Sequence, residues 1–331
     1  MDAITIAALL GDATIRPIVI HPEDDDARWR EDLERFLSGD ATLTRQSAGE
    51  AAIMAVQRLM IFLGYSTSSG GACVVDGDFG RGTNRGIAQF QFEHGLAGGI
   101  DRATLCYPCR WNTAARLIGT IPDARLTPQT LHAMLHSARE RCARGEVMTG
   151  TVDDAVFHLN ALHKRRFLDC RRIAERYGEL AITVCTRLRD DADYRIAPEW
   201  VLAIVRQETA GVVRPRFEQH YLSRLNGQHP DEALAALRMR SMSLGLGQIM
   251  GENFRRVGAP NAEALFTAPS AEQLAYVARF LKPKAAVVAR RDPGEAAFRE
   301  IAHFYNGPGY EAHRYHESLA RWFREFRLLL A

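Results

Sequence analysis

The sequence predicts a mainly helical chain with about two domains, and three observations support this. The chain has 331 residues, whereas a typical domain has about 150. In several segments apolar residues recur every three or four positions, which is the period of an amphipathic helix. The composition, with 47% hydrophobic and 25% charged residues, is that of an ordinary globular protein. These features argue against collagen-like, disordered and membrane-spanning classes.

Charge is distributed unevenly although the net charge is only +2. Residues 1–50 carry a net charge of −6, and residues 194–331 carry +5. No part is basic enough to predict a nucleic-acid partner, and the basic residues alternate with acidic ones. The C-terminal part is nevertheless suited to an anionic surface.

The number and spacing of the cysteines do not predict a metal site. Six cysteines in 331 residues are too few for a disulfide scaffold. Cys106 and Cys109 form a C-x-x-C pair upstream of His132 and His136, but the gap from Cys109 to His132 is longer than in a usual zinc finger. We therefore expect mostly buried free thiols, with neither a metal nor a cofactor.

The start of the chain lacks the features of a secretory signal. It begins Met1-Asp2 without a basic region before the apolar residues that follow. No apolar run reaches the roughly 18 residues of a spanning helix. We expect synthesis in the cytoplasm and no stable membrane insertion.

Three helices are predicted between residues 48 and 137, after an acidic segment at 1–44. The first follows an apolar stripe and ends at Gly64, and the second, capped by Thr83, ends at Gly95. Between them lies Val75–Thr83, where three glycines indicate positive φ angles and Phe79 is the one large residue that can be buried. The third begins with Thr127 as N-cap and Pro128 in the first turn.

The motifs D-G-x-F-G-x-x-T and L-T-P-x-T-L in this region resemble the peptidoglycan-binding domain of cell-wall hydrolases. The resemblance implies a three-helix bundle whose turns line a shallow groove for stem peptide and glycan. Asp76, Gly77, Phe79 and Arg81 become candidate wall contacts on that basis. The alternative is a plain three-helix bundle whose glycines serve only the turn.

Glu208 is the candidate catalytic acid. Val201, Ile204, Val205 and Glu208 fall on one helical stripe, so a carboxylate occupies an apolar face. It also lies in the last turn before Gly211, near the negative end of the helix dipole. Both surroundings disfavour the anion and predict a raised pKa, which suits a general acid in glycosidic cleavage. The alternative is an exposed glutamate on a frayed helix end.

Further candidates follow in three short motifs. Glu218 shares a predicted helical face with Tyr221 and Leu222, and its unknown distance from Glu208 leaves retaining and inverting mechanisms open. Glu218 and His220 can also be purely structural. Two later segments combine flexible backbone or aromatic rings with polar groups suited to sugar binding. Their candidate residues are Gly245, Gly247, Gln248, Tyr305, Asn306 and Tyr310.

In this order E-T-x-G, F-E-x-H-Y, S-x-G-L-G-Q-I-M-G and Y-N-G-P-G-Y resemble the N-acetylmuramidase family of phage endolysins, over about residues 195–328. The resemblance implies a lysozyme-like, mostly helical catalytic domain that cleaves the β-1,4 bond between N-acetylmuramic acid and N-acetylglucosamine. Glu208 maps to the catalytic acid, and Glu218 to a supporting catalytic carboxylate. Either Glu218 or an ordered water would stabilise the oxocarbenium-like state. The remaining family positions map to substrate-binding residues, with Thr209 standing where serine is usual. These residues are Thr209, His220, Gly247, Gln248, Tyr305, Asn306 and Tyr310.

Together the two resemblances predict a modular endolysin that acts as a monomer on peptidoglycan. Its parts would be an acidic segment at 1–44, a wall-binding domain at 45–140, a helical connector at 141–193 and a catalytic domain at 194–331. It would reach the wall after holin-type release and lyse the host. A lytic transglycosylase, a non-catalytic wall-binding or virion protein, and an arginine-rich nucleic-acid binder are the alternatives.

The end of the chain predicts one more amphipathic helix. Trp322, Phe323 and Phe326 form an apolar side next to three arginines. Such a helix can touch a membrane surface, but closing the catalytic core is the interpretation that we favour.

Overall fold

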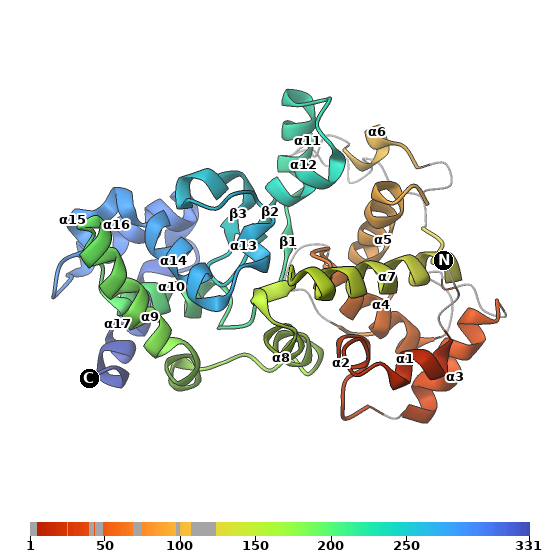
Figure 1. Cartoon of the computed structure of the whole chain (residues 1–331). Coiled ribbons are helices and arrows are strands. Elements are labelled where there is room, and N and C mark those ends of the chain that lie inside the picture. The colour runs from red at the N-terminus through yellow and green to blue at the C-terminus, as the bar shows by residue number, and fades with distance from the viewer. Residues whose placement is uncertain are drawn as a thin grey trace. The chain divides into compact units, whose positions relative to one another are not determined.

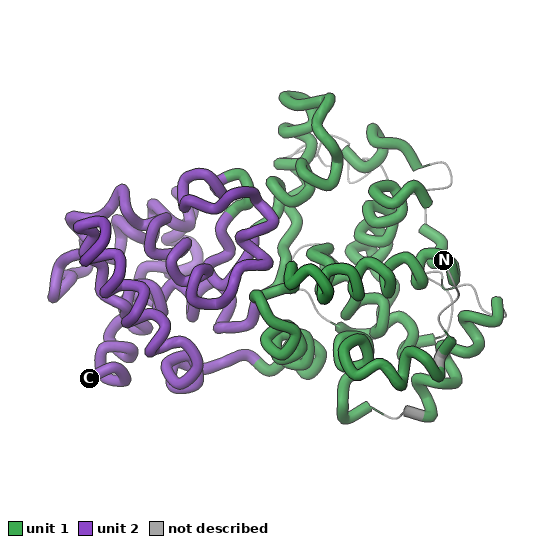
Figure 2. Tube along the Cα trace, viewed as in Figure 1, with its two compact units in different colours: residues 1–166, 214–243, 250–252 green, residues 167–213, 244–249, 253–331 purple. Residues whose placement is uncertain are grey.

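The computed structural model describes residues 5–24, 26–39, 43, 49–68, 75–96, 100–106 and 124–331. These residues are mainly helical, as the sequence predicts, with three short strands (Figure 1). The backbone forms two compact units, coloured separately in Figure 2. Unit 1 comprises residues 1–166, 214–243 and 250–252, and unit 2 comprises residues 167–213, 244–249 and 253–331. The four-part division expected from the sequence remains a prediction.

Unit 1 is built around helix α4, which is buried along almost its whole length and packs against α2, α3, α7 and α8. Its buried side chains are apolar apart from Gln57 and Arg58. The helices of the N-terminal segment are α1 (Ile6–Gly11), α2 (Arg16–Val19), α3 (Asp26–Leu37), α4 (Glu50–Phe62), α5 (Arg81–Glu93), α6 (Arg102–Leu105), α7 (Pro128–Arg144), the 3₁₀ helix η1 (Met148–Gly150) and α8 (Val152–His163). The later segment adds α11 (Gln219–Gln228) and α12 (Leu234–Arg240).

The three helices predicted between residues 48 and 137 are present as α4, α5 and α7. The cap of α7 is as expected, since the Thr127 hydroxyl accepts a hydrogen bond from the Thr130 amide at 3.2 Å. The N-cap of α5 differs from the prediction. Gly80 is its N-cap, whereas Thr83 lies inside the helix and donates to the Asp78 carbonyl at 3.3 Å. The hydroxyl therefore ties the helix to the preceding loop instead of capping it.

Only one of the three loop glycines in this region has a positive φ angle. Gly77 has φ +72°, so the expectation is correct there. Gly80 has φ −75°, and Gly82 serves close packing because a Cβ there would lie 2.3 Å from the Thr67 carbonyl oxygen. Sequence alone does not separate these two uses of glycine.

Unit 2 is organised around α10 (Pro198–Glu208), whose apolar residues are fully buried. Helices α9, α14 and α17 pack against it, and Trp200 contacts Phe298 and Phe323 in the core. Helix α17 thus closes this core, as the sequence analysis favours. The other elements are α9 (Cys170–Ala192), α13 (Ala264–Thr267), α14 (Ser270–Phe280), η3 (Lys282–Lys284), α15 (Ala285–Val288), α16 (Glu295–Asn306), η4 (Pro308–Glu311) and α17 (Tyr315–Leu329).

A small sheet and one 3₁₀ helix contain residues of both units. The sheet has the strand order β1 (Arg216–Phe217), β2 (Met242–Leu244), β3 (Ile249–Met250). Strands β1 and β2 are antiparallel, with Arg216 opposite Ser243. The 3₁₀ helix η2 (Gly251–Val257) follows β3. No helix within the described ranges is long and apolar enough to cross a membrane.

Candidate active site

Helix α10 carries Glu208 at its C-terminal end. Pro198 occupies the first turn, where its missing amide hydrogen is not needed. Val201, Ile204 and Val205 are completely buried, whereas Glu208, on the same stripe, is partly exposed. The helix ends where the sequence predicts, because Ala210 and Gly211 adopt φ angles of +48° and +71°. The core of unit 2 thus holds the Glu208 backbone rigidly and leaves its carboxylate accessible.

Tyr315 contacts the Glu208 carboxylate directly. Its phenol donates a hydrogen bond to Glu208 Oε1 at 2.5 Å, and its side chain is buried at the start of α17. Burial raises the pKa of Tyr315 well above its usual value, and the charge of Glu208 raises it further. The phenol therefore stays protonated and serves as a permanent donor. Sequence analysis missed this residue, because Tyr315 lies outside every motif and looks like any aromatic residue of an amphipathic helix.

The turn after β2 is held by side chains from three other segments. Thr209 Oγ1 donates to the Leu246 carbonyl at 2.9 Å, and the Leu246 amide donates to Gln273 Oε1 at 3.0 Å. The Tyr305 phenol donates to the Gly247 carbonyl at 2.7 Å. Thr209 is only 1% exposed, so its hydroxyl holds this turn, and a substrate contact by Thr209 remains a prediction.

Position 247 requires glycine because its surroundings leave no room for a side chain. A Cβ there would lie 2.4 Å from Val277 Cγ2 and 2.7 Å from the Tyr305 phenol oxygen. Gln248 follows with φ +48° and donates from Nε2 to the Gly245 carbonyl at 3.3 Å. The tight fit brings the Gly247 backbone and the Tyr305 phenol together.

Tyr305 also lies within the electrostatic reach of Glu208. Burial raises the pKa of Tyr305 well above its usual value, and the Glu208 charge raises it further. Glu208, Tyr305 and Tyr315 thus form one cluster of an ionisable carboxylate and two protonated phenols. Such a cluster can stabilise a carboxylate that has just given up its proton.

Asn306 and Tyr310 lie at the C-terminal end of α16 and in the following 3₁₀ helix. Asn306 is exposed at the last position of α16. The Tyr310 phenol donates to Glu311 Oε1 at 3.1 Å, and its ring contacts His303 and His316. Asn306 and Tyr310 therefore belong to an accessible segment that follows Tyr305 in the chain, and their contacts with sugar remain predictions.

Glu218 and His220 belong to unit 1, whereas Glu208 belongs to unit 2. Glu218 precedes the first turn of α11 and pairs with Arg216 at 3.0 Å. His220 Nδ1 lies 3.8 Å from the other oxygen of the same carboxylate. These contacts agree with the structural alternative, and a catalytic role for Glu218 remains a prediction.

The candidate wall-binding residues lie in a loop of unit 1 that Gln57 holds in place. The Asp76 and Gly77 amides both donate to Gln57 Oε1 at 3.0 Å, and Gln57 Nε2 donates to Asp76 Oδ1 at 2.8 Å. Phe79 is 2% exposed and anchors the loop in the core. Asp76 and Arg81 are exposed, so they are the members of this set that can meet a ligand.

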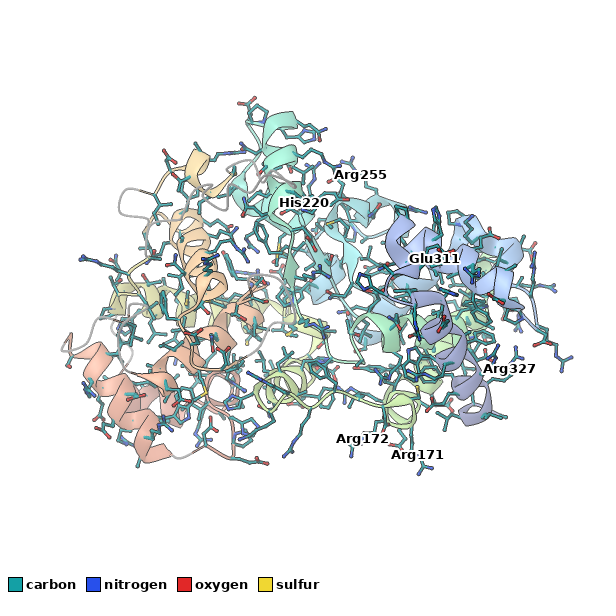
Figure 3. The ribbon with its side chains drawn as sticks, turned by 180° about the vertical axis from the view of Figure 1, so that it is seen from behind. Arg171, Arg172, His220, Arg255, Glu311 and Arg327 are labelled. Atoms are coloured by element: carbon teal, nitrogen blue, oxygen red, sulfur yellow. The ribbon has the colours of Figure 1, made fainter. Side chains whose placement is uncertain are left out.

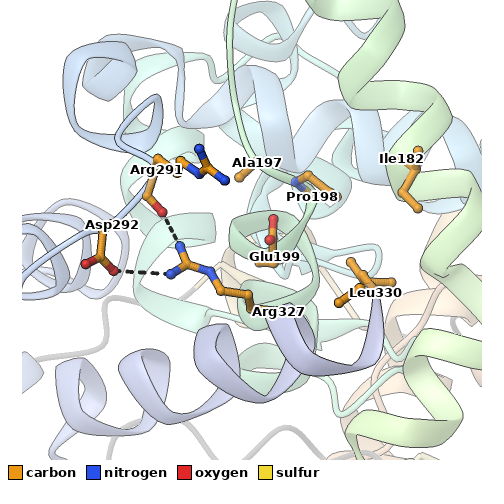
Figure 4. Close-up of a pocket in the computed structure, with 9 residues that line it drawn as sticks. Ile182, Ala197, Pro198, Glu199, Arg291, Asp292, Arg327 and Leu330 are labelled. Atoms are coloured by element: carbon orange, nitrogen blue, oxygen red, sulfur yellow. Dashed lines mark hydrogen bonds and ion pairs between the residues drawn. The ribbon is translucent and has the colours of Figure 1, made fainter.

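A cavity of about 720 Å³ lies at the opposite end of α10 (Figure 4). Its lining includes Pro198, Glu199 and Leu330, while Arg327 reaches the Asp292 carboxylate at 3.2 Å. Nine residues of helix separate Glu199 from Glu208, which corresponds to about 14 Å at 1.5 Å per residue. This cavity is therefore distinct from the Glu208 cluster.

The described residues contain no group of three or more histidine, cysteine, aspartate or glutamate side chains that could hold a metal ion. Cys106, Cys142, Cys170 and Cys185 are free thiols. Cys109, the second member of the C-x-x-C pair, lies outside the described residues.

Comparison with known proteins supports the interpretation of the C-terminal half. Residues 231–327 match the model of the N-acetylmuramidase family. No curated protein matches the sequence. Among solved structures, the crystal structure of Burkholderia AP3 phage endolysin is 18% identical, covering 88% of this chain and 99% of the endolysin chain, with a TM-score of 0.33. The match over residues 231–327 places an N-acetylmuramidase domain in this part of the chain and supports a peptidoglycan-cleaving hydrolase.

Proposed function

We propose that the protein is a lysozyme-type endolysin that hydrolyses the β-1,4 bond between N-acetylmuramic acid and N-acetylglucosamine. The observation that carries this proposal is the Glu208 carboxylate, partly exposed at the end of a buried helix and hydrogen-bonded by the buried Tyr315 phenol. The family match begins at residue 231, C-terminal to Glu208. The role of Glu208 thus rests on its own geometry and on the motif order.

In this mechanism, protonated Glu208 gives its proton to the glycosidic oxygen as the bond to the muramic acid C1 breaks. Positive charge develops on the sugar, water adds to C1 and loses one proton to the solvent, and Glu208 takes up a proton again before the next turnover. As the proton leaves, negative charge develops on Glu208, where the Tyr315 hydrogen bond stabilises it. Tyr305 holds the Gly247 backbone beside this centre.

The decisive variant is Glu208→Gln, which keeps the shape of the side chain but removes the transferable proton. We expect release of soluble fragments from purified peptidoglycan to fall by at least about a hundredfold, because general acid catalysis contributes about 10²–10⁴-fold. Glu199→Gln, on the same helix at its other end, is the matched control and should keep near-normal activity. Near-normal activity of Glu208→Gln would refute the proposal.

Mass spectrometry of the digest identifies the bond and the reaction. Reducing muramic acid ends are expected for hydrolysis. Products with 1,6-anhydro ends would instead assign the chain to the lytic transglycosylases. Sedimentation with insoluble wall, without release of fragments, would favour a non-catalytic binding protein.

A further inference from the structure

A second pocket in unit 2 is lined by positive charge. It has a volume of about 500 Å³ and lies where the ends of α9 and α14 meet η2 and η3. Four of the described residues that line it are basic and none is acidic. The basic residues are Arg255, Arg256, Arg279 and Lys282.

Two of these four cations are already held by the protein. Arg279 pairs with Glu272 at 2.6 Å and donates to the Val257 carbonyl at 3.3 Å. The Arg256 guanidinium stacks on the rings of Phe280 and Phe304, at 4.4 and 4.9 Å from their centroids. These contacts fix the position of both charges at the pocket wall.

The other two cations, Arg255 and Lys282, are exposed, and the Arg255 guanidinium lies over the ring of its neighbour Phe254, 5.1 Å from the centroid. Within the described part of the chain, neither forms an ion pair with a carboxylate. With Arg279 neutralised by Glu272, three positive charges remain around the pocket and repel one another, and a bound anion would relieve that repulsion. The pocket is therefore electrostatically suited to a ligand that carries carboxylates.

A layer of aromatic rings lies between the pocket and the Glu208 cluster. Phe280, on which Arg256 stacks, contacts Tyr305 edge to face at 5.2 Å between ring centroids. Tyr305 in turn holds the Gly247 carbonyl. Arg256, Phe280 and Tyr305 thus connect the basic pocket to the turn beside Glu208 through direct contacts.

We propose that this pocket binds the carboxylates of the peptidoglycan stem peptide. The inference rests on the proposed function, because the stem peptide branches from the muramic acid whose bond is cleaved. Free carboxylates along the peptide match the two unpaired cations, and charge-assisted hydrogen bonds to arginine give the contact its strength. The pocket would make the enzyme prefer peptide-bearing glycan over bare glycan.

The test is the double variant Arg255→Gln/Lys282→Gln, assayed on two substrates. One is intact peptidoglycan and the other is the same material after an amidase has removed the stem peptides. We expect KM on intact peptidoglycan to rise about fivefold to tenfold, the effect of losing two exposed charged contacts. Activity on the bare glycan should not change.

The matched control is Arg171→Gln/Arg172→Gln, which removes the same charge from exposed positions at the start of α9. Figure 3 shows these two residues well away from Arg255. The control should leave KM unchanged on both substrates, because Arg171 and Arg172 do not line the pocket and the loss of two positive charges elsewhere should not weaken substrate binding there. An equal rise of KM in the control and the double variant would overturn the proposal.

Three further outcomes would be decisive. Equal effects of the double variant on the two substrates, or no effect on either, would overturn the pocket assignment and leave the proposed function intact. If the wild-type protein cleaved neither substrate, the proposed function itself would fail. Isolated stem peptide should inhibit the wild type more strongly than inorganic phosphate at equal ionic strength, and equal inhibition would indicate an unspecific anion site.

Discussion

Both units contain a glycine-rich turn held by a buried glutamine, yet the two turns differ in what else they contact. In unit 1, Gln57 binds the Asp76 and Gly77 amides. In unit 2, Gln273 accepts from the Leu246 amide and donates to the Phe266 and Ala268 carbonyls at 3.1 and 2.9 Å.

Of these two turns, as far as the structure describes them, the one in unit 2 is connected to Glu208. Thr209, next to Glu208 in the chain, binds its Leu246 carbonyl, and Tyr305 binds its Gly247 carbonyl. In the unit 1 turn, the additional support comes from Thr83 and the buried Phe79. The glutamine thus stabilises a turn in both units, whereas the hydrogen bonds from Thr209 and Tyr305 distinguish the candidate catalytic turn from the unit 1 turn.

The largest effect is expected when the unit 2 turn is overpacked by Gly247→Ala. The new methyl would lie 2.4 Å from Val277 Cγ2, so the turn or the α14 side chains must move. We expect a loss of about 3 kcal/mol in the free energy of unfolding, at the upper end of overpacking costs. Activity should fall with it, because the Tyr305 hydrogen bond to Gly247 is displaced.

Urea unfolding and fragment release measure these two effects. Gly227→Ala is the control, since no atom lies within 4 Å of the added methyl at this exposed position of α11, and it should not lower the unfolding free energy, because alanine favours a helix more than glycine does. A stable, fully active Gly247→Ala variant would contradict the role of this turn.

An intermediate effect is expected from Gln57→Leu in unit 1. The substitution leaves the Asp76 and Gly77 amides without their acceptor. We expect a loss of about 2 kcal/mol in unfolding free energy, the usual cost of unsatisfied buried polar groups. Glycan cleavage per folded molecule should persist, because Gln57 has no link to Glu208.

Gln273→Leu is the counterpart in unit 2 and should reduce both stability and activity. Unfolding followed by circular dichroism, together with turnover on soluble glycan at low temperature, separates the two losses. If Gln57→Leu abolished cleavage while the chain stayed folded, the distinction between the two turns would be wrong.

Some features of the two units could be predicted from the sequence, and others could not. The helix boundaries around Thr127 and Glu208 could be predicted because local caps and apolar stripes determine them. The positive φ of Gly77 was also predicted, but the packing role of Gly82 depends on the Thr67 carbonyl, which the loop sequence does not reveal.

The candidate site was predictable only in part. Glu208 stood out because an acid on an apolar stripe breaks the expected pattern. Tyr315 did not, because an aromatic residue at the start of an amphipathic helix fits that pattern. Its role depends on the packing of α17 against α10, a contact between residues 107 positions apart. The basic pocket likewise gathers side chains of four separate segments, none of which is unusual alone.

The smallest effect in this series is expected from Tyr315→Phe, which removes one hydroxyl and keeps the ring. The Tyr315 hydrogen bond favours the charged form of Glu208, so its loss leaves Glu208 protonated up to a higher pH. The alkaline limb of the pH–activity profile should therefore move to higher pH. At the same time kcat should fall about tenfold, because the new negative charge loses a donor worth about 1.4 kcal/mol.

Tyr194→Phe distinguishes this positioning role from a general loss of stability. Tyr194 is also buried, and its phenol donates to the Ala278 carbonyl at 2.9 Å, in the same unit but without contact to Glu208. Both variants should lower the unfolding free energy by a similar amount, since each deletes one buried hydrogen bond. Only Tyr315→Phe should shift the alkaline limb. If both variants or neither shifted it, Tyr315 would be a structural residue, and the two phenols around Glu208 would no longer distinguish the unit 2 turn from its unit 1 counterpart.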